Sequence, residues 1–390
     1  MKNIGVYLRT EPHQGGAYQF WISIVDALVS EREQHNFNIV LFAEKTEWKF
    51  LADKYDLKFE ILSQDKVINK ICNIFCSIVF PFPIYKRICP VWSTHYGIIL
   101  KNKIDIWFAS SPKRVTKDLH IKSVSPIFDL MHLYEPRFKE VQVNKKNRER
   151  TNKKICKYTS IVLADSQVGK NQIVESYGKN VKNLSPKVKV LPFIPADYIY
   201  NLQNMDQSVD VGFDKYILYP AQFWSHKNHK NLLLAISLLK SKGININLVC
   251  VGSAKNAFEN VKKLIQEECL DRQVKILGYV NNDDIISLYK HARAMVMPTF
   301  FGPTNIPPLE AFVLGCPVAV SNIYGIPEQV GDAALLFNPA SVEEIAECVE
   351  QLWVDDALCE ELAAEGKKRS ELWGQQQYAD MLAQYIDELE

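Results

Sequence analysis

The segment from Tyr219 to Leu233 combines a polar loop, a lysine and the expected start of a helix. An apolar strand pattern ends at Tyr219, and a helical pattern begins near Asn228. A lysine directly before a helix N-terminus suits a diphosphate, because the ammonium, the helix dipole and free backbone N–H groups attract the same anion. We therefore predict that Lys227 binds phosphate oxygens, and the alternative is an ordinary surface lysine.

A second polar loop follows the strand expected at 294–297. Gly302, Thr304 and Asn305 form a tight turn with exposed amides. A helix follows, and its first turn tolerates Pro307 and Pro308. Glu310 then lies one turn inside this apolar helix, where a carboxylate costs free energy unless donors pair with it. Two interpretations stay open. Glu310 binds two vicinal hydroxyls, such as those of a ribose, or it is a first-turn glutamate stabilised by the helix dipole.

Small residues stand at two further strand ends, Gly252 and Gly278, and small residues let a ligand approach the backbone. The nucleotide-binding patterns GxGxxG and GxxxxGK[ST] are both missing, which disfavours an NAD enzyme and a P-loop enzyme.

Apolar strand patterns alternate with helical patterns along most of the chain, which is typical of parallel α/β domains. We expect strands at 3–8, 38–42, 104–108, 125–128, 161–164, 216–219, 246–251, 274–277, 294–297 and 318–320. We expect helices at 17–30, 230–242, 260–269, 283–291, 307–314, 342–353 and 375–390. Segment 71–100 is apolar, aromatic and irregular.

The length of 390 residues suggests two domains. We predict doubly wound, Rossmann-like domains at 1–200 and 214–374, a linker at 201–213, and a C-terminal helix at 375–390 that packs back on the first domain. Ligands of such sheets bind beyond the carboxyl ends of the strands.

The composition is that of an ordinary globular protein, with 47% hydrophobic and 23% charged residues. We expect no signal peptide and no membrane-spanning helix. The nine cysteines form no CxxC pair or Cys/His cluster, so we expect a reduced, cytoplasmic protein without a metal site.

The net charge of +1 is unevenly distributed. Residues 1–200 contain 31 Lys+Arg and 19 Asp+Glu, a balance of +12, and the remainder therefore carries −11. The basic run 145–157 is either a solvated helix face or a contact for an anionic surface. Together with segment 71–100 it predicts an anionic membrane surface as a partner of the N-terminal half. No nucleic-acid-binding motif is recognisable.

The order of these motifs resembles the retaining glycosyltransferases of family 4, which have the two-domain GT-B fold. The resemblance covers nearly the whole chain and is strongest over 216–339. The residues that carry it are Pro220–His229, Leu277–Val280, Gly302–Ala311, Gly315–Val318 and Gly325–Glu328.

The resemblance implies that the C-terminal domain holds a nucleotide sugar. Lys227 would bind its diphosphate, and Glu310 would hold its ribose as the second acid of the family's Glu-x7-Glu motif. The backbone near Tyr279 and Val280 would meet the base.

For the N-terminal domain, the resemblance implies that Gly15 and Gly16 form the glycine loop beneath the donor phosphates. Asp129 follows a strand end that faces the reacting sugar. Asp129 or His132 would orient hydroxyl groups of the donor or acceptor.

Three positions depart from the family pattern. Gly302 replaces the first acid of Glu-x7-Glu, Gln222 replaces an arginine that often precedes the lysine, and Phe128 replaces a histidine. We interpret these changes as a variant donor site, and we expect Gln222, Gly252, Thr304, Asn305 and Ile306 to belong to it.

The implied activity is a retaining, metal-independent hexosyl transfer, of the mannosyl- or rhamnosyltransferase kind, to a glycan or lipid-linked glycan acceptor. It would serve bacterial surface polysaccharides of the O-antigen, lipopolysaccharide or capsule type, in the cytoplasm or at the inner face of the cell membrane. The alternatives are a nucleotide-sugar epimerase on the same fold and a catalytically silent partner subunit.

Overall fold

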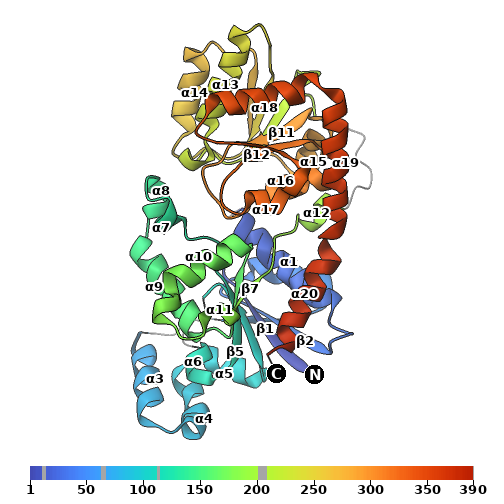
Figure 1. The fold of residues 1–390 in the computed structure, drawn as a ribbon. Helices are drawn as coiled ribbons and strands as arrows, with labels where there is room; N and C mark the ends of the chain where they lie inside the picture. Colours follow the sequence, from blue (N-terminus) through green and yellow to red (C-terminus); the bar gives the residue numbers. More distant parts are fainter. Residues whose placement is uncertain (11–14, 63–66, 112–114, 201–208, 390) are drawn as a thin grey trace. The chain divides into compact units, whose positions relative to one another are not determined.

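The computed structural model describes residues 1–10, 15–62, 67–111, 115–200 and 209–389 (Figure 1). The chain divides into two compact units. Unit 1 comprises Met1–Phe128, Lys146–Pro192 and Gln375–Glu390. Unit 2 comprises Asp129–Lys145 and Phe193–Gly374.

Unit 1 is built on a seven-stranded sheet with the order β3-β2-β1-β4-β5-β6-β7, in which every pairing is parallel. Its strands are β1 (Lys2–Leu8), β2 (Phe37–Ala43), β3 (Lys58–Ile61), β4 (Ile106–Ala109), β5 (Lys122–Pro126), β6 (Ile161–Ala164) and β7 (Val188–Val190). The central strands are nearly continuous apolar runs because helices cover both faces of a parallel sheet. The edge strand β3 is only partly buried.

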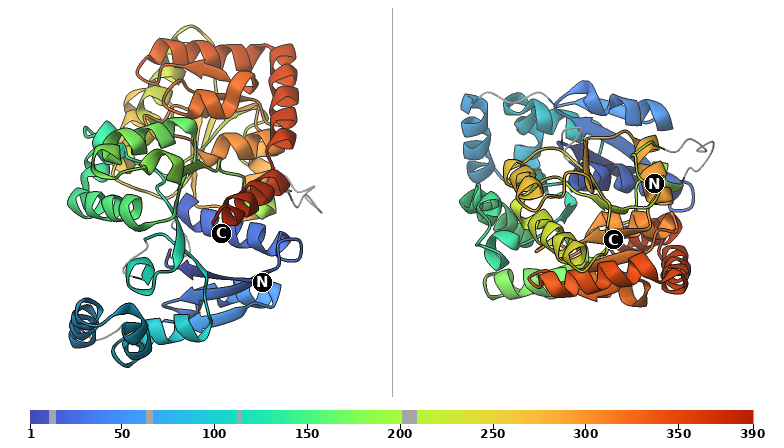
Figure 2. Two further views of the ribbon diagram at one scale, coloured as in Figure 1. Left: turned by 60° about the horizontal axis from the view of Figure 1, so that its bottom comes forward. Right: turned by 90° about the horizontal axis from the view of Figure 1, so that it is seen from above.

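Ten α-helices accompany this sheet in the described part of the chain. They are α1 (Gly16–Ser30), α2 (Lys49–Tyr55), α3 (Val67–Val79), α4 (Phe82–Trp92), α5 (Thr94–Lys101), α6 (Val115–Leu119), α9 (Lys145–Tyr158), α10 (Gln167–Tyr177), α11 (Leu184–Lys187) and α20 (Gln375–Asp387). The C-terminal helix α20 packs against α1, and the Lys2 ammonium lies 2.8 Å from the Asp387 carboxylate. Figure 2 gives two further views of these elements.

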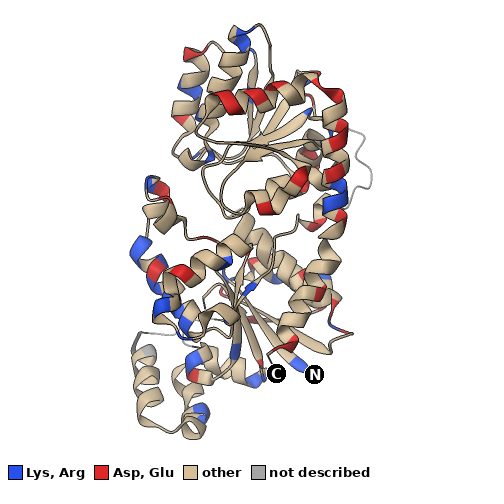
Figure 3. Cartoon of the chain, in the orientation of Figure 1, with Lys and Arg blue, Asp and Glu red and all other residues tan. Residues whose placement is uncertain are grey.

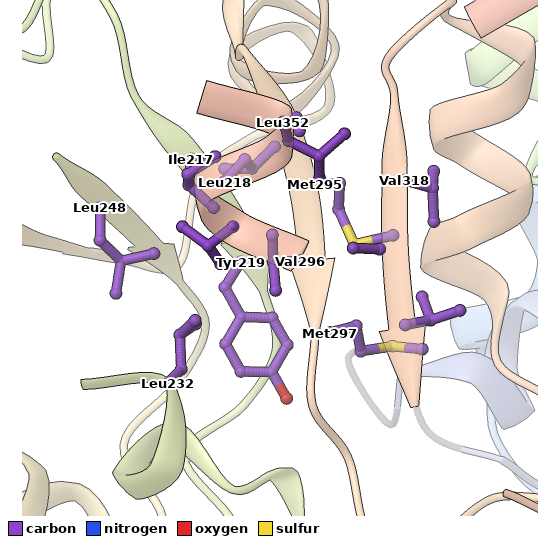
Figure 4. Close-up of a cluster of buried hydrophobic side chains, with 14 of the residues drawn as sticks. Ile217, Leu218, Tyr219, Leu232, Leu248, Met295, Val296, Met297, Val318 and Leu352 are labelled. Atoms are coloured by element: carbon purple, nitrogen blue, oxygen red, sulfur yellow. The ribbon is translucent and has the colours of Figure 1, made fainter. Parts of the chain in front are cut away.

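Unit 2 repeats the same strand order with six parallel strands, β10-β9-β8-β11-β12-β13. They are β8 (Ile217–Pro220), β9 (Leu248–Val251), β10 (Val274–Gly278), β11 (Ala294–Met297), β12 (Val318–Ser321) and β13 (Leu335–Phe337). Side chains of β8 and β11, including Leu218, Val296 and Met297, form the buried core shown in Figure 4.

Unit 2 also contains a series of α-helices. They are α7 (Met131–Tyr134), α8 (Lys139–Gln142), α12 (Asp197–Tyr200), α13 (His229–Ser241), α14 (Phe258–Glu267), α15 (Asn282–His291), α16 (Ile306–Val313), α17 (Ile326–Val330), α18 (Val342–Val354) and α19 (Asp356–Leu372). The Ser341 side chain accepts a hydrogen bond from Glu344 N at the start of α18, and Asp355 does the same for α19. Such caps satisfy N–H groups that the helix itself leaves open.

The predicted α/β class with two doubly wound parallel sheets is confirmed. Two predictions differ from the structure. Segment 71–100 is helical, since it forms most of α3, α4 and α5. Residues 129–145 and 193–200 belong to unit 2, whereas we expected 1–200 to form one domain. Most of the expected linker, 201–208, lies outside the described residues.

None of the helices in the described ranges is both long enough and apolar enough to cross a membrane.

Candidate functional site

The candidate site of unit 2 begins where β8 and β11 end. These strands are neighbours at the centre of the sheet, and the chain proceeds from them toward opposite edges. Such a reversal of strand order leaves a crevice at the carboxyl ends of the strands, where ligands of open α/β sheets bind. The loop after β8 carries Lys227, and the loop after β11 carries Thr304 and Asn305. Sheet topology thus brings together residues about eighty positions apart.

The Lys227 loop is fixed from both sides. Asn228 has a left-handed backbone (φ 59°), which asparagine tolerates better than most residues. The Asn228 side-chain amide donates to Pro298 O (2.9 Å) and Pro339 O (2.8 Å). The Tyr219 hydroxyl, labelled in Figure 4, donates to Lys227 O at 2.5 Å. These bonds hold the loop in place, and α13 begins directly after it at His229.

The Lys227 side chain points at the second loop. Its Nζ donates to Asn305 Oδ1 at 2.9 Å. Burial lowers the pKa of Lys227 to about 8, because the charged form is poorly solvated there. An amide oxygen compensates a buried ammonium only in part, so this cation is suited to an anionic ligand.

Asn305 is held by its backbone, which leaves its side chain for polar contacts. Asn305 N donates to Gln329 Oε1 (3.0 Å), and Gln329 Nε2 donates to Asn305 O (2.7 Å). Within the described residues, the buried Asn305 Nδ2 has no hydrogen-bond partner. An unsatisfied buried donor costs roughly 1–3 kcal/mol, which makes Nδ2 suited to a ligand oxygen.

Gly302 has a structural reason to be glycine. Its φ of +112° strains any residue with a side chain. A Cβ at position 302 would lie 2.8 Å from Asn305 Nδ2 and 3.0 Å from Thr304 O. A side chain at position 302 and the Asn305 side chain therefore exclude each other, because both cannot occupy this space.

Glu310 lies on α16 and is half-buried. The Tyr289 hydroxyl donates to Glu310 Oε2 at 2.8 Å. Burial nevertheless raises the pKa of Glu310 to about 7, while the Tyr289 hydrogen bond opposes this shift. Glu310 thus differs from a solvated first-turn glutamate, because its carboxylate is incompletely compensated and its pKa lies near neutral pH.

Residues 129–145 pack on the Lys227 loop within unit 2. Glu140 Oε1 lies 3.0 Å from His226 Nδ1 and accepts from His226 N (3.1 Å), and Asn256 Nδ2 donates to Glu140 Oε2 (3.0 Å). Burial alone would raise the pKa of Glu140, but these hydrogen bonds lower it. Phe138 adds ring contacts to His226 and Phe301. These contacts explain why this segment belongs to unit 2.

His226 stays uncharged at neutral pH. Burial, followed by the nearby Lys227 cation, lowers its pKa to about 3 against the opposing effect of Glu140. Its ring stacks on Phe301 with 3.7 Å between centroids. His226 therefore serves to fix the loop.

Asp129 and His132 lie in unit 2, although we expected them in the N-terminal domain. Asp129 Oδ1 accepts from Met131 N (2.9 Å) at the start of α7, and the Asp129 charge acts on His226. The His132 side chain is completely buried. Asp129 is thus near the Lys227 loop, whereas His132 has no exposed surface.

The other predicted residues either follow a strand of unit 2 or lie at the start of a helix. Gln222 and Gly252 lie at the ends of β8 and β9. The Gln222 carboxamide accepts from Trp224 Nε1 (3.0 Å). A Cβ at Gly252 would lie 2.3 Å from Ala221 O, so this glycine is required by the protein backbone itself.

Tyr279 and Val280 follow β10, and 71% of the Tyr279 surface is exposed. Ile306 is the first residue of α16. Gly15 and Gly16 are exposed at the start of α1 in unit 1, where Gly15 has φ +65°.

Sequence reasoning missed three residues of this site: Tyr289, Gln329 and Glu140. Tyr289 had no signal, because it precedes Glu310 by 21 positions on another helix. Gln329 directly follows the Gly325–Glu328 motif, so its position was a signal. Glu140 lies just past the Asp129 segment, and only the structure brings it to His226.

Residues 203–369 match the sequence profile of the family "Glycosyl transferases group 1". The chain is 31% identical to an O-antigen chain mannosyltransferase B of Escherichia coli over 177 residues, which are 45% of either chain. It is 28% identical to a serotype-specific mannosyltransferase, WbdA, of Escherichia coli over 247 residues. That alignment covers 61% of this chain and 29% of the relative. The chain thus spans less than half the length of these relatives.

A solved structure with the same fold is that of the Anabaena protein HepE in complex with UDP-glucose. It superposes with a TM-score of 0.70 at 14% identity and covers 100% of both chains. The expected GT-B fold is therefore confirmed.

Proposed function

We propose, since residues 203–369 match the profile of the glycosyl transferases group 1 family, that this chain is a glycosyltransferase of bacterial surface-polysaccharide synthesis. It moves a hexosyl group from a nucleoside-diphosphate sugar to a glycan acceptor. The similarity to O-antigen mannosyltransferases supports mannose as the transferred sugar and an O-antigen-type glycan as the product.

The observation that carries this proposal is the pair Lys227–Asn305 at the ends of β8 and β11. The pair presents a half-buried cation and an unused amide donor in the crevice where this sheet type binds ligands. In the unliganded protein, the Lys227 ammonium contacts a neutral amide oxygen. A diphosphate supplies a negatively charged partner for this ammonium.

The reaction breaks the bond between the sugar C1 and the diphosphate oxygen and forms a bond between C1 and an acceptor hydroxyl oxygen. The acceptor proton passes to the leaving diphosphate. Negative charge develops on that diphosphate, and Lys227 Nζ stabilises it electrostatically without a need for a metal ion. Retention of configuration follows if the acceptor attacks from the face that the diphosphate leaves.

The other predicted residues complete the donor site. Glu310 accepts hydrogen bonds from the ribose hydroxyls, which compensates its buried charge. Asn305 Nδ2 donates to a donor oxygen and takes the place left by Gly302. Asp129 orients a hydroxyl near the Lys227 loop, and Tyr279 and Val280 meet the base.

The acceptor is a glycan, free or lipid-linked. The excess of basic residues in the first half supports work in the cytoplasm at the inner face of the cell membrane, where a soluble donor meets a lipid-linked acceptor.

A thermal-shift screen tests the proposal directly. GDP, UDP, dTDP and their sugars are added to the full chain, because a ligand of the native state alone raises the melting temperature. We expect one nucleotide family to stabilise the protein, and Lys227→Ala to abolish this shift. Lys230→Ala is the matched control, since Lys230 is exposed three residues away on α13.

Product analysis separates the alternatives. Incubation of the stabilising sugar nucleotide without acceptor yields an epimer only if the chain is an epimerase. A lack of stabilisation by every nucleotide would favour a catalytically silent subunit and would contradict the proposal.

A further inference from the structure

The outer face of α3 is apolar. Ile71, Ile74, Phe75, Ile78 and Val79 are 61%, 36%, 64%, 77% and 52% exposed. Their spacing of i, i+3, i+4, i+7 and i+8 places them on one side of the helix. Amphipathic helices normally turn this side toward the core, so the apolar face of α3 lacks the cover it requires in water.

The orientation of α3 is set by its polar side. Asn73 and Cys76 are buried, with 6% and 8% of their surface exposed. Asn73 Oδ1 accepts from the Tyr85 hydroxyl at 3.1 Å, and Tyr85 is itself buried on α4. A rotation of α3 that buried Ile78 would break this hydrogen bond between the helices.

Further apolar side chains are exposed in the turn after α3 and on α4. Phe80 in the turn is 40% exposed, and Ile84 and Val91 on α4 are 48% and 72% exposed. Figures 1 and 2 show α3 and α4 as a helical pair beside the sheet of unit 1. We call α3, α4 and the turn Phe80-Pro81 the apolar hairpin.

The charged residues of the apolar hairpin itself all have one sign, and the acidic Asp118, whose charge acts on Cys89 of α4, is buried. The sequence contains no Asp or Glu from 66 to 104, but it contains six Lys and Arg. Lys86 and Arg87 are exposed on α4, and no acidic residue is drawn on either helix in Figure 3. A protein-binding surface commonly mixes both signs, whereas cations beside aliphatic side chains match anionic lipid headgroups above acyl chains.

A second basic surface lies on α9. Lys146, Arg150, Lys153 and Lys157 are exposed at helical spacing, and Figures 1 and 2 place α9 on the same side of unit 1 as α3. Lys153 is paired with Glu149 at 3.8 Å, an exposed pair of little energetic weight.

We propose that the apolar hairpin docks this protein on an anionic lipid bilayer. Ile71, Phe75 and Ile78 enter the interface between headgroups and acyl chains, and Lys86 and Arg87 contact the headgroup phosphates. The inference rests on the proposed function only in that the docked surface then lies beside a lipid-linked acceptor. Lipid binding itself requires no donor and no turnover.

Vesicle co-sedimentation of the full chain tests the docking. The probes are phosphatidylcholine vesicles with and without 30% phosphatidylglycerol, at roughly 0.05 M and 0.5 M salt. We expect binding to the anionic vesicles at low salt, and at least about tenfold weaker binding to neutral vesicles or at high salt.

Two variants assign the binding to the apolar hairpin. Ile71→Ser/Ile78→Ser should weaken it by about tenfold or more, and Lys86→Glu/Arg87→Glu by a similar factor. The matched controls are Val354→Ser/Leu372→Ser, whose wild-type side chains are 65% and 77% exposed in unit 2, and Lys262→Glu/Lys263→Glu on α14. Both controls should bind like the wild type.

Three results would overturn the proposal: equal binding to neutral and anionic vesicles, no binding to either, or full binding by both hairpin variants. A wild-type dimer that Ile71→Ser/Ile78→Ser converts to a monomer, without vesicle binding, would assign the surface to a second copy instead. Nucleotide stabilisation, measured separately, keeps a failure of docking distinct from a failure of the transferase proposal.

Discussion

The Lys227 loop of unit 2 and the apolar hairpin of unit 1 depart in opposite ways from the usual distribution of charged and apolar side chains between surface and interior. Lys227 is a cation whose pKa falls to about 8 because burial removes its water. Ile78 is an aliphatic side chain that remains 77% exposed to water. Buried charges and exposed apolar surfaces are the informative exceptions in a folded protein, because each costs free energy.

The difference teaches what each region lacks. In our proposals, the charged and hydroxyl groups of a ligand pair with Lys227 and Glu310. The acyl chains of a bilayer cover the exposed apolar side chains of the apolar hairpin. Substitutions in either region should therefore leave the protein folded but weaken the binding of its ligand or of lipid. The reverse holds for core residues such as Leu218, whose truncation would cost about 2–5 kcal/mol.

The largest effect is expected at Lys227. Lys227→Ala should lower turnover by on the order of 10²–10³, the cost typical of removing one donor to a developing oxyanion. Gln222 is neutral and cannot share the charge. Steady-state kinetics with the donor identified by thermal shift measures this effect.

Lys230→Ala is the control for Lys227→Ala and should keep wild-type turnover. A loss below about tenfold in Lys227→Ala, with an unchanged melting temperature, would locate the diphosphate away from this loop.

Glu310→Gln should weaken nucleotide binding by roughly tenfold to a hundredfold. Glutamine keeps the size and the Tyr289 contact but loses charge-assisted hydrogen bonds of about 1.5–3 kcal/mol. Calorimetric titration with the nucleotide measures the affinity.

The same variant should raise the melting temperature of the unliganded protein at pH 8 and leave it nearly unchanged at pH 4. The folded-state pKa of Glu310, about 7, lies above its ordinary 4.5. The folded wild type is therefore most stable, with respect to this group, below pH 4.5, and this stability is lost as the pH rises through 7. A lower melting temperature with unaltered affinity would make Glu310 a structural residue.

Gly302→Ala should destabilise unit 2 by about 1–3 kcal/mol, because its backbone is strained for a side chain and Asn305 lies in the way. Gly278→Ala is the control, since Gly278 also has a positive φ (+72°) but its Cβ would have no atom within 4 Å. Urea unfolding compares the two. An equal cost would mean that the Asn305 side chain does not require glycine at position 302.

The smallest effect is expected on the stability of the apolar hairpin. Ile71→Ser/Ile78→Ser should change the free energy of unfolding by less than about 0.5 kcal/mol, as exposed positions usually do. Ile99→Ala on α5, where the side chain is fully buried, should cost about 2–5 kcal/mol. A large loss in the double variant would show that the outer face of α3 is covered.

Much of the fold was predictable because central parallel strands are apolar runs separated by amphipathic helices. The edge strands β3, β7 and β13 were missed. β3 and β7 contain lysine, and β7 and β13 have only three residues each. The α3–α5 region was predicted as irregular because Pro81, Pro83 and Pro90 interrupt the segment, and Pro90 lies inside α4.

The residues of the candidate site could be predicted from the sequence where they lie in recognisable motifs. Lys227, Asn305 and Glu310 stand in recognisable segments, and Lys227 and Asn305 meet because β8 and β11 are neighbours. The contacts of Tyr289 with Glu310 and of Glu140 with His226 depend on tertiary packing between distant segments. No local pattern encodes such pairs.

The central claim is that Lys227 and Glu310 bind one nucleotide sugar, and calorimetric affinity measured from pH 6 to pH 10 tests it most directly. The intact sugar diphosphate is the ligand, because a free terminal phosphate would itself titrate near pH 6. His226, with a pKa of about 3, stays uncharged throughout this range. Wild-type affinity should fall below about pH 7, as Glu310 binds a proton, and above about pH 8, as Lys227 loses one. Lys227→Ala should bind weakly and lack the alkaline decline, and Glu310→Gln should lack the acidic one. Wild-type affinity and pH dependence in both variants would contradict the account.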